Sequence, residues 1–165
     1  MTAVTAQENI DLYGSADLAW SAVLEQLEAG RAEHYWLATV DPDGRPHLNG
    51  VGARWADGRL YFKSGARTRK SKNLDGDRRC VIAAQLPELD VTFTGEAELV
   101  TDATTVQRIA DLYAATGWPA RARGIQLEAD YSAPTAGPPP WDLWTMAPES
   151  AVGLGASGAM RWHFG

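Results

Sequence analysis

Short runs of aromatic and β-branched residues, separated by glycine-containing turns, restrict most strongly how this chain can fold. Tyr35–Val40 leads into a turn at Asp41–Gly44. Pro46–Trp55 leads into the pair Asp57-Gly58, and a third run follows at Arg59–Lys63. Aromatic and β-branched residues favour strands, and Asp-Gly pairs favour the tight turns that join antiparallel neighbours. The first half of the chain therefore predicts an antiparallel meander.

The second half adds more strand patterns. Arg79–Leu86 and Val91–Val100 predict two strands, and the second of them alternates apolar residues with threonine and glutamate. Closing strands are predicted at Trp141–Met146, Ala151–Leu154 and Met160–Phe164. The sequence therefore predicts a mainly β fold with flanking helices, built on an antiparallel barrel of six to seven strands.

Helical periodicity appears in three places. Ser15–Ala29 predicts an amphipathic helix with Ser15 as its N-cap, and Thr68–Leu74 predicts a short helix capped by Thr68. A third helix is predicted to begin at Asp102 and to end near Gly117. Its buried stripe is expected to consist of Val106, Ile109, Ala110 and Tyr113.

The length of 165 residues suits one domain spanning the whole chain. Residues 1–14 predict a flexible N-terminal arm, and residues 128–140, rich in proline and glycine, predict an extended loop. No apolar run approaches the roughly 20 residues of a membrane span, and the polar N-terminus does not resemble a secretory signal. With Cys80 as the single cysteine, these features predict a cytoplasmic protein. The three histidines lack metal-ligand spacing, so no metal site is predicted.

Positive charge is concentrated in one segment of an otherwise acidic chain. The formal net charge is −6, which disfavours a general nucleic-acid-binding protein. Yet 7 of the 15 cationic residues lie between Lys63 and Arg79. This distribution favours a local anionic ligand.

The sequence from Leu60 to Leu74 concentrates the groups that bind phosphate. A strand is predicted to end at Lys63-Ser64, and a helix is predicted to begin after Thr68. A helix N-terminus attracts phosphate through its free N–H groups and its dipole, and hydroxyls and cations add to this attraction. A solvated basic turn is the alternative interpretation. A nucleotide-binding P-loop is excluded, because Arg69 stands where that motif requires a glycine before the lysine.

Two other features can be interpreted in two ways. The Gly50-Val51-Gly52 stretch interrupts a strand pattern, as at a bulge or where a ligand approaches the backbone. Trp118 and the pair Trp141 and Trp144 flank the extended loop and are expected either to wall a substrate pocket or to pack a dimer. The remaining notable tryptophans, Trp20 and Trp36, are predicted to lie in the core.

The strand end Tyr61–Ser64, followed five residues later by Arg69-Lys70, resembles the cofactor-phosphate motif of the pyridoxamine 5′-phosphate oxidase-like superfamily. The resemblance extends from the helix at Ser15 to the C-terminal Arg161–Phe164 and so covers nearly the whole chain. The loop Pro138–Trp141 and the closing Met160–Trp162 resemble the actinobacterial branch that uses the deazaflavin coenzyme F-420.

The resemblance implies a split β-barrel homodimer with two cofactors bound between the subunits. It further implies that Lys63, Ser64 and the pair Arg69-Lys70 hold the cofactor phosphate, while Asn49–Arg54 runs beside the ring. The candidate cofactor-binding residues are Asn49, Gly50, Val51, Gly52, Arg54, Lys63, Ser64, Arg67, Thr68, Arg69, Lys70 and Lys72. Asp90 stands where the flavin oxidases place an amide side chain, which argues against oxidation of pyridoxamine phosphate itself.

The choice of cofactor depends on positive charge beyond the phosphate motif. FMN ends at its phosphate, whereas F-420 continues into a tail of carboxylates, so Arg67 and Lys72 favour F-420. The resulting hypothesis is a reductase that transfers hydride from reduced F-420 to a small conjugated acceptor. The alternatives are an FMN-dependent oxidoreductase and a non-catalytic protein that binds flavin, deazaflavin or tetrapyrrole. No residue is predicted as the proton donor.

Overall fold

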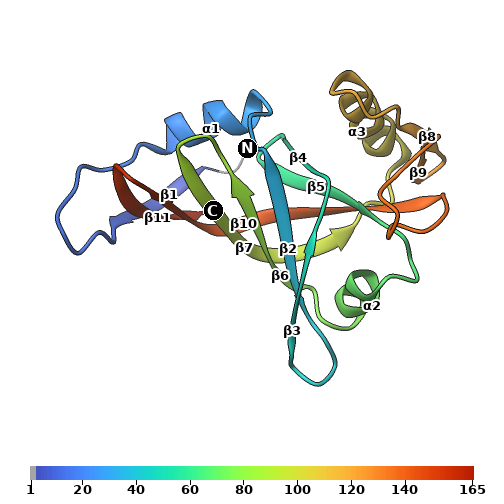
Figure 1. Cartoon of the computed structure of the whole chain (residues 1–165), viewed down its shortest axis with the longest axis horizontal. Helices are drawn as coiled ribbons and strands as arrows, with labels where there is room; N and C mark the ends of the chain where they lie inside the picture. Colours follow the sequence, from blue (N-terminus) through green and yellow to red (C-terminus); the bar gives the residue numbers. More distant parts are fainter. Residues whose placement is uncertain (1–2) are drawn as a thin grey trace.

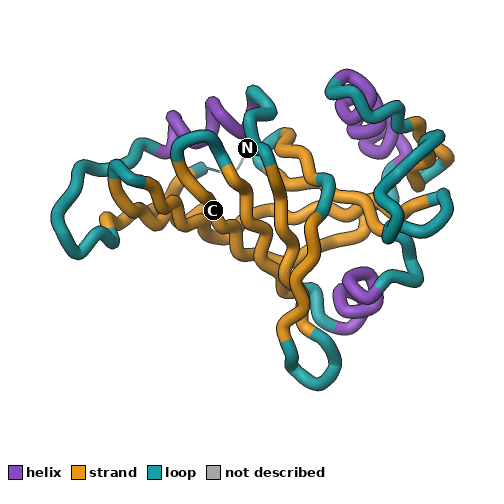
Figure 2. Tube along the Cα trace, in the orientation of Figure 1, coloured by secondary structure: helices purple, strands orange, loops and turns teal. Residues whose placement is uncertain are grey.

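The computed structural model describes residues 3–165 and arranges them as one antiparallel sheet of 11 strands with three helices (Figures 1 and 2). The helices are α1 (Trp20–Glu28), α2 (Arg69–Gly76) and α3 (Ala103–Ala115). The strands are β1 (Val4–Asn9), β2 (His34–Val40), β3 (Pro46–Gly50), β4 (Ala53–Ala56), β5 (Arg59–Ser64), β6 (Arg79–Gln85), β7 (Leu89–Leu99), β8 (Arg121–Arg123), β9 (Gln126–Glu128), β10 (Trp141–Gly155) and β11 (Gly158–Phe164).

The long strand β10 joins the parts of the sheet. Its 15 residues pair with β7 over most of their length, and the other edge pairs with β5 near its start and with β11 near its end. The main path through the sheet runs β1-β11-β10-β7-β6-β2-β3, while β4, β5, β8 and β9 lie off it. The sheet does not close on itself.

Two apolar clusters stabilise this sheet. In the larger one, α1 packs Trp20 edge-on against Trp55 and Phe93, with ring centroids 6.2 and 6.4 Å away. In the smaller one, α3 covers the start of β10 through the predicted stripe of Val106, Ile109, Ala110 and Tyr113, all of them buried. The second cluster fixes α3 at one end of the molecule, beside β8 and β9 (Figure 1).

The predicted fold class, mainly antiparallel β with flanking helices, is confirmed, although the sheet is not a closed barrel and the strands are divided differently. The sheet has more than the six to seven strands expected, because Pro46–Trp55 is broken at Val51-Gly52, because β1 forms near the N-terminus, and because a short β8–β9 hairpin is added. Conversely, the two strands expected at Trp141–Leu154 form the single strand β10, which bends through a register shift between Pro148 and Ser150. A β-bulge of this kind lets one strand continue past a local kink.

The helix ends confirm the cap predicted at Thr68 and the helix start predicted at Asp102, and they correct the cap predicted at Ser15. Thr68 and Asp102 accept the N–H groups of Ser71 and Thr105, as expected of N-cap residues. The first helix instead begins at Trp20, and Ser15 does not cap it, because the Ser15 hydroxyl donates to Asp11. The residues before Trp20 therefore form an irregular loop.

The N-terminal segment also differs from the expectation of a flexible arm. Within residues 1–14, Val4–Asn9 forms β1 and pairs with β11, so the backbone groups on one side of this strand are held in ladder hydrogen bonds at the edge of the sheet. The long loop between β9 and β10 lies where the sequence predicted it. Within residues 3–165, no helix is long and apolar enough to cross a membrane, and no group of three or more candidate ligands is placed to hold a metal ion.

Of the two tryptophans that were predicted to lie in the core, only one does. Trp20 packs against the larger apolar cluster, but Trp36 is 41% exposed, so its prediction was wrong. Neighbouring Tyr35 and Leu37 point inward, and period-two alternation forces Trp36 onto the outer face of the sheet.

Because β10 and β11 approach closely at Gly153, we expect one added methyl group there to destabilise the protein. A Cβ at Gly153 would lie 2.7 Å from the fully buried Trp162 ring. We expect Gly153→Ala to lower the free energy of unfolding by about 1–3 kcal/mol, as overpacked cores do. The control is Gly76→Ala, where a Cβ would meet no atom within 4 Å. Urea denaturation of both variants measures the effect, and equal stabilities would contradict this packing.

Candidate functional site

The junction of β5 and α2 is built from glycine and three hydroxyls. Gly65 lies so close to the β9–β10 loop that a Cβ would approach the carbonyl oxygen of Ala136 to 2.8 Å. Thr68 Oγ1 lies 2.8 Å from Ser64 Oγ and donates to the Gly65 carbonyl oxygen, also at 2.8 Å. Ser71 Oγ donates to Ser64 Oγ at 2.6 Å. These contacts hold the end of β5 against the first turn of α2.

The break between β3 and β4 leaves free space beside this junction. The Tyr113 hydroxyl donates to the Gly52 carbonyl oxygen at 2.6 Å and so ties the break to α3. Burial raises the pKa of that hydroxyl, which keeps it a neutral donor. A Cβ at Gly52 would meet no atom within 4 Å. Packing within the protein therefore does not require glycine at this position, and its small size leaves room for another molecule.

Three adjoining hollows surround these residues. An anion compartment of about 60 Å³ lies between the Gly50–Gly52 break, Lys63-Ser64 and Lys70. An aromatic compartment of about 230 Å³ shares Gly52 and Lys63 with it and continues toward Trp118. An outer groove of about 470 Å³ runs from the start of α2 along the β9–β10 loop. The order of the hollows along the surface suits one extended ligand or two adjacent ones.

Lys63 lies between the first two compartments and is held there by the loop and two aromatic rings. Its Nζ donates to Ser132 Oγ at 2.5 Å and lies 4.4 and 4.8 Å from the ring centroids of Trp141 and Trp118. Burial, with a smaller repulsion from Lys70, lowers the pKa of Lys63 from 10.5 to about 8. Lys63 is thus a cation that is partly removed from water without a carboxylate partner.

Arg54 borders the aromatic compartment on the side of α3. Its Nε and Nη2 donate to Thr116 Oγ1 at 3.1 and 2.9 Å, and its guanidinium carbon lies 5.2 Å from the centroid of the Tyr113 ring. These contacts fix the guanidinium plane and leave the compartment bordered by a second cation.

The predicted cations share one property. Within residues 3–165, the ion pairs to carboxylates are formed by Arg45, Arg59, Arg79, Arg108, Arg121, Arg123 and Arg161. None of these is a predicted site residue. Among these described residues, the six predicted cations, from Arg54 to Lys72, therefore have no carboxylate within 4.0 Å. A group of uncompensated cations attracts an anion.

The structure brings most of the predicted site residues together but not all of them. Gly50, Val51, Gly52, Lys63, Ser64 and Lys70 line the anion compartment, Arg54 lines the aromatic one, and Arg67 and Thr68 line the outer groove. Arg69 is exposed and Asn49 is half-buried, and neither lines these three hollows. The Ser64 and Thr68 hydroxyls are engaged with one another, so they shape the compartment as well as bordering it.

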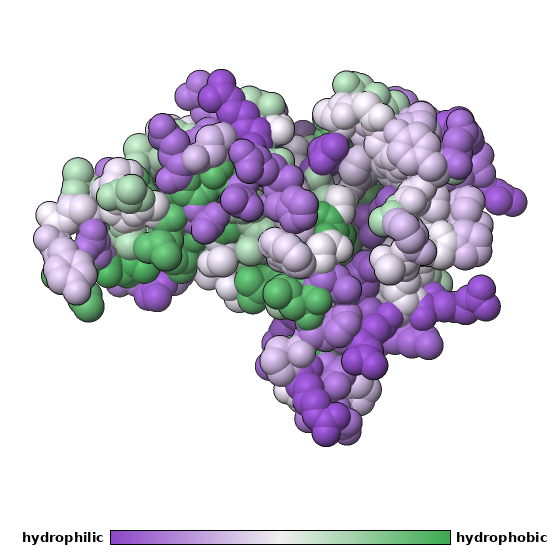
Figure 3. Space-filling view, viewed as in Figure 1, coloured by the Kyte–Doolittle hydropathy of each residue, from purple (hydrophilic) through white to green (hydrophobic). Residues whose placement is uncertain are grey.

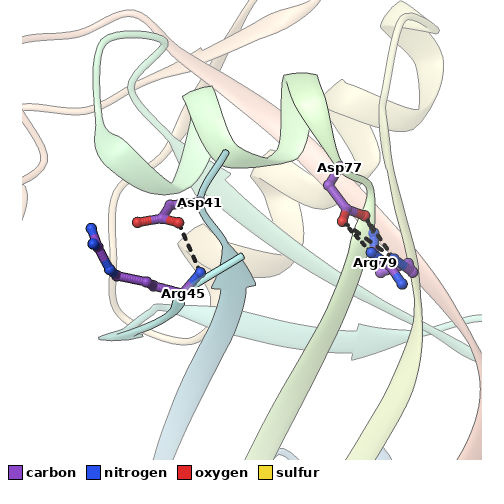
Figure 4. A network of polar contacts seen from close by, with 4 residues as sticks. All are labelled: Asp41, Arg45, Asp77 and Arg79. Carbon is purple, nitrogen blue, oxygen red and sulfur yellow. Dashed lines mark hydrogen bonds and ion pairs between the residues drawn. The ribbon is translucent and has the colours of Figure 1, made fainter. Parts of the chain in front are cut away.

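Lys72 faces a different groove, on the other side of α2. That groove is also lined by Asp41 and Asp77, whose carboxylates accept from the Arg45 backbone N–H and from the Arg79 side chain (Figure 4). Because acidic groups border it, this groove suits a polyanionic tail less well than the outer groove does.

Several lining residues were not predicted from the sequence. Tyr113 appeared only as a member of the buried stripe of α3, and Tyr131 and Ser132 lie in a loop without a motif. Trp118 Nε1 donates to the Tyr131 carbonyl oxygen at 2.8 Å, which holds this loop over the site. Of the three tryptophans near the loop, Trp118 walls the aromatic compartment, Trp141 lies behind Lys63, and Trp144 is in the core.

Comparisons with known proteins bear on the family and the fold of the chain. The family model described as pyridoxamine 5′-phosphate oxidase matches residues 21–135, which is more than half of the chain. None of the curated proteins matches the sequence.

Solved structures share the fold at low sequence identity. A pyridoxamine 5′-phosphate oxidase-related, FMN binding protein from Nostoc punctiforme is 21% identical, with a TM-score of 0.59 over 90% of this chain and 91% of that one. A NimC/NimA family protein from Clostridium acetobutylicum is 14% identical, with a TM-score of 0.62 over 87% and 90%. A structure described as an F420 reductase is 20% identical, with a TM-score of 0.54 over 77% and 93%.

The buried position of Lys63 predicts a pH-dependent stability. Because its pKa is about 8 in the folded protein and 10.5 ordinarily, the folded state binds fewer protons than the unfolded state between these values. Stability should therefore rise between pH 8 and pH 10.5, since the cost of burying the charge is present below this range and disappears above it.

Lys63→Met should be more stable than the parent at pH 8. Its stability should not show the increase between pH 8 and pH 10.5 that Lys63 causes in the parent. Urea denaturation at both pH values measures the difference from the parent, and Lys72→Met serves as the exposed control. A Lys63→Met variant with the same pH profile as the parent would show that the ammonium group is not buried.

Proposed function

The chain belongs to the pyridoxamine 5′-phosphate oxidase family, and on that premise we propose that it binds a flavin-type cofactor through its phosphate. The anion compartment supports this proposal most directly, because Lys63 and Lys70 border it without a carboxylate partner. Burial lowers the pKa of Lys70, and an anion beside it would favour its charged form again. The first turn of α2 adds backbone N–H groups and the positive end of the helix dipole.

The residues also fit a planar ring beside the phosphate. The Gly50–Gly52 break presents backbone where a side chain would obstruct a ring, and no protein atom occupies the space beside Gly52 that a ring would need. A flavin or deazaflavin bound here supplies hydride chemistry. The chain's own part is to hold the phosphate, to orient the ring along Asn49–Arg54 and to exclude water with the β9–β10 loop.

The outer groove favours F-420 over FMN as the cofactor. It continues past the anion compartment, sharing Gly65 and Ala136 with it, and Arg67 lines it. A cofactor that ends at its phosphate leaves this groove and its cation unused, whereas a carboxylate-bearing tail would follow it. Lys72, on the other side of α2, does not contribute to this argument.

The proposed reaction is transfer of hydride from reduced F-420 to a small conjugated acceptor. An FMN-dependent oxidoreductase and a non-catalytic protein that binds flavin, deazaflavin or tetrapyrrole use the same compartments and are the alternatives. They differ in measurable ways: FMN would be released on denaturation of the purified protein, and a non-catalytic protein would bind its cofactor tightly without reducing any acceptor.

We also propose that the protein is a homodimer formed through the outer face of the sheet. Strand register puts Trp36, Leu48 and Leu154 on that face, and Leu48 and Leu154 are each 62% exposed. Apolar side chains reach the surface where β2, β3 and β6 lie (Figure 3). Trp36 pairs with Gly50, so a second copy on this face would also cover the open side of the anion compartment.

Removal of two cations tests the phosphate site. Arg69→Ala/Lys70→Ala should abolish binding of F-420 and of FMN while the fold remains intact, because Arg69 is exposed, Lys70 is only half-buried, and neither side chain pairs with a carboxylate in the described residues. Fluorescence titration measures affinity, and circular dichroism checks the fold. Arg31→Ala, which removes an exposed arginine outside the site, is the control. Unchanged affinity in the double variant would overturn the site assignment.

The same titration separates the two cofactors. Arg67→Ala should weaken binding of F-420 by about 3- to 10-fold, as expected for one partly exposed charge pair, and should leave FMN affinity unchanged. Shortening the glutamate tail should weaken binding to the parent protein and have little effect on the variant. Equal losses for both cofactors would assign Arg67 to the phosphate instead of the tail.

A charge on the apolar face tests the homodimer. Leu48→Asp should convert the dimer to a monomer, because it would bury a carboxylate in the proposed interface. Ile125→Asp is the control, since Ile125 is 46% exposed on the turn between β8 and β9. Light scattering after size exclusion gives the mass. A parent protein that is already monomeric would contradict the proposal.

A further inference from the structure

The aromatic compartment combines rings and cations in a single row. Arg54 lies over Tyr113, Tyr113 meets Trp118 edge-on with centroids 5.2 Å apart, and Lys63 lies over Trp118. Tyr131 closes the compartment from the loop, and its hydroxyl donates to the Gly117 carbonyl oxygen at 3.2 Å. The walls are thus flat, largely apolar and fixed by hydrogen bonds before any ligand arrives.

The two cations keep hydrogen-bonding capacity that the protein does not use. A guanidinium has five N–H donors, and Arg54 directs three of them to Thr116 Oγ1 and the Ala53 carbonyl oxygen. An ammonium has three donors, and Lys63 directs one of them to Ser132 Oγ. Half-buried cations that lack carboxylates and keep free donors are costly unless a ligand supplies the anion.

Size and lining separate this compartment from the phosphate site. Ser64, Gly65 and Lys70 line the anion compartment but not the aromatic one. A volume of about 230 Å³ lies below the range of about 300–1,000 Å³ that is typical of drug-sized ligands, so one or two fused rings would fill it. The shared residues Gly52 and Lys63 would bring such a molecule alongside the cofactor ring.

We propose that the aromatic compartment is the acceptor site and that its ligand is a planar aromatic or conjugated carboxylate. The ring system packs against Trp118 and Tyr131, and the carboxylate lies between Arg54 and Lys63. This inference rests on the proposed function, because it names the class of acceptor that the cofactor would serve. It assigns to Arg54 a role in selecting the acceptor, separate from the cofactor phosphate.

Binding without cofactor tests the proposal directly. Isothermal titration of the cofactor-free protein with 2-naphthoate should show binding, and uncharged 2-naphthalenemethanol should bind about 10- to 100-fold more weakly, as expected for loss of a charged hydrogen bond. Arg54→Met should lower the affinity for 2-naphthoate by a similar factor. Trp118→Leu should also lower it, and Trp118→Phe should recover part of the loss because it restores an aromatic wall.

Two controls keep this result separate from the phosphate site. Arg59→Met removes a partly exposed arginine that pairs with Glu98 away from the compartment, and it should bind 2-naphthoate as the parent does. Arg69→Ala/Lys70→Ala should lose the cofactor and keep 2-naphthoate. The proposal is overturned if 2-naphthoate does not bind, if the uncharged analogue binds equally well, or if Arg54→Met leaves its affinity unchanged.

Discussion

The pairing of β10 with β5 on one edge and β7 on the other is the constraint on which the rest of this structure depends. Residues 142–146 pair with 60–64, so the last residues of β5 are held beside the start of β10. That pairing puts Lys63 close to the Trp141 ring and brings the preceding loop over the β5–α2 junction. The pairing with β7 continues past the bulge to the far end of the sheet. The apolar core and the candidate site are thus organised by one strand.

The resulting site has free space for a ligand, and hydrogen bonds within the protein fix the groups that line it. Gly52 leaves a gap that no protein atom fills, while Tyr113 fixes its carbonyl oxygen. The hydroxyls of Ser64, Thr68 and Ser71 are engaged with one another and therefore shape the anion compartment before any phosphate enters it. Such preorganisation reduces the conformational cost of binding.

Electrostatics distinguishes this region from the rest of an acidic surface. Seven arginines elsewhere in residues 3–165 pair with carboxylates, whereas the cations around the compartments do not. Keeping Lys63 partly buried and uncompensated lowers its pKa and weakens the folded state at neutral pH. A ligand that brings negative charge reverses this cost, so the same cation links folding stability to binding. Membership of the pyridoxamine 5′-phosphate oxidase family is consistent with such a ligand but does not identify it.

Local sequence determined most of the strands and turns, the Thr68 helix cap and the position of the basic segment, because each depends on neighbours within a few residues. Thr68 caps α2 and the third helix starts at Asp102 as predicted, and the buried stripe of α3 follows from its periodicity. Only the tertiary structure decided that Trp36 faces outward, that Lys72 lies on a different groove from Arg67, and that Tyr113 and Ser132 border the site. These outcomes depend on which strands pair and on where a motif-free loop crosses the sheet, and no local pattern encodes a contact between residues so far apart in the chain.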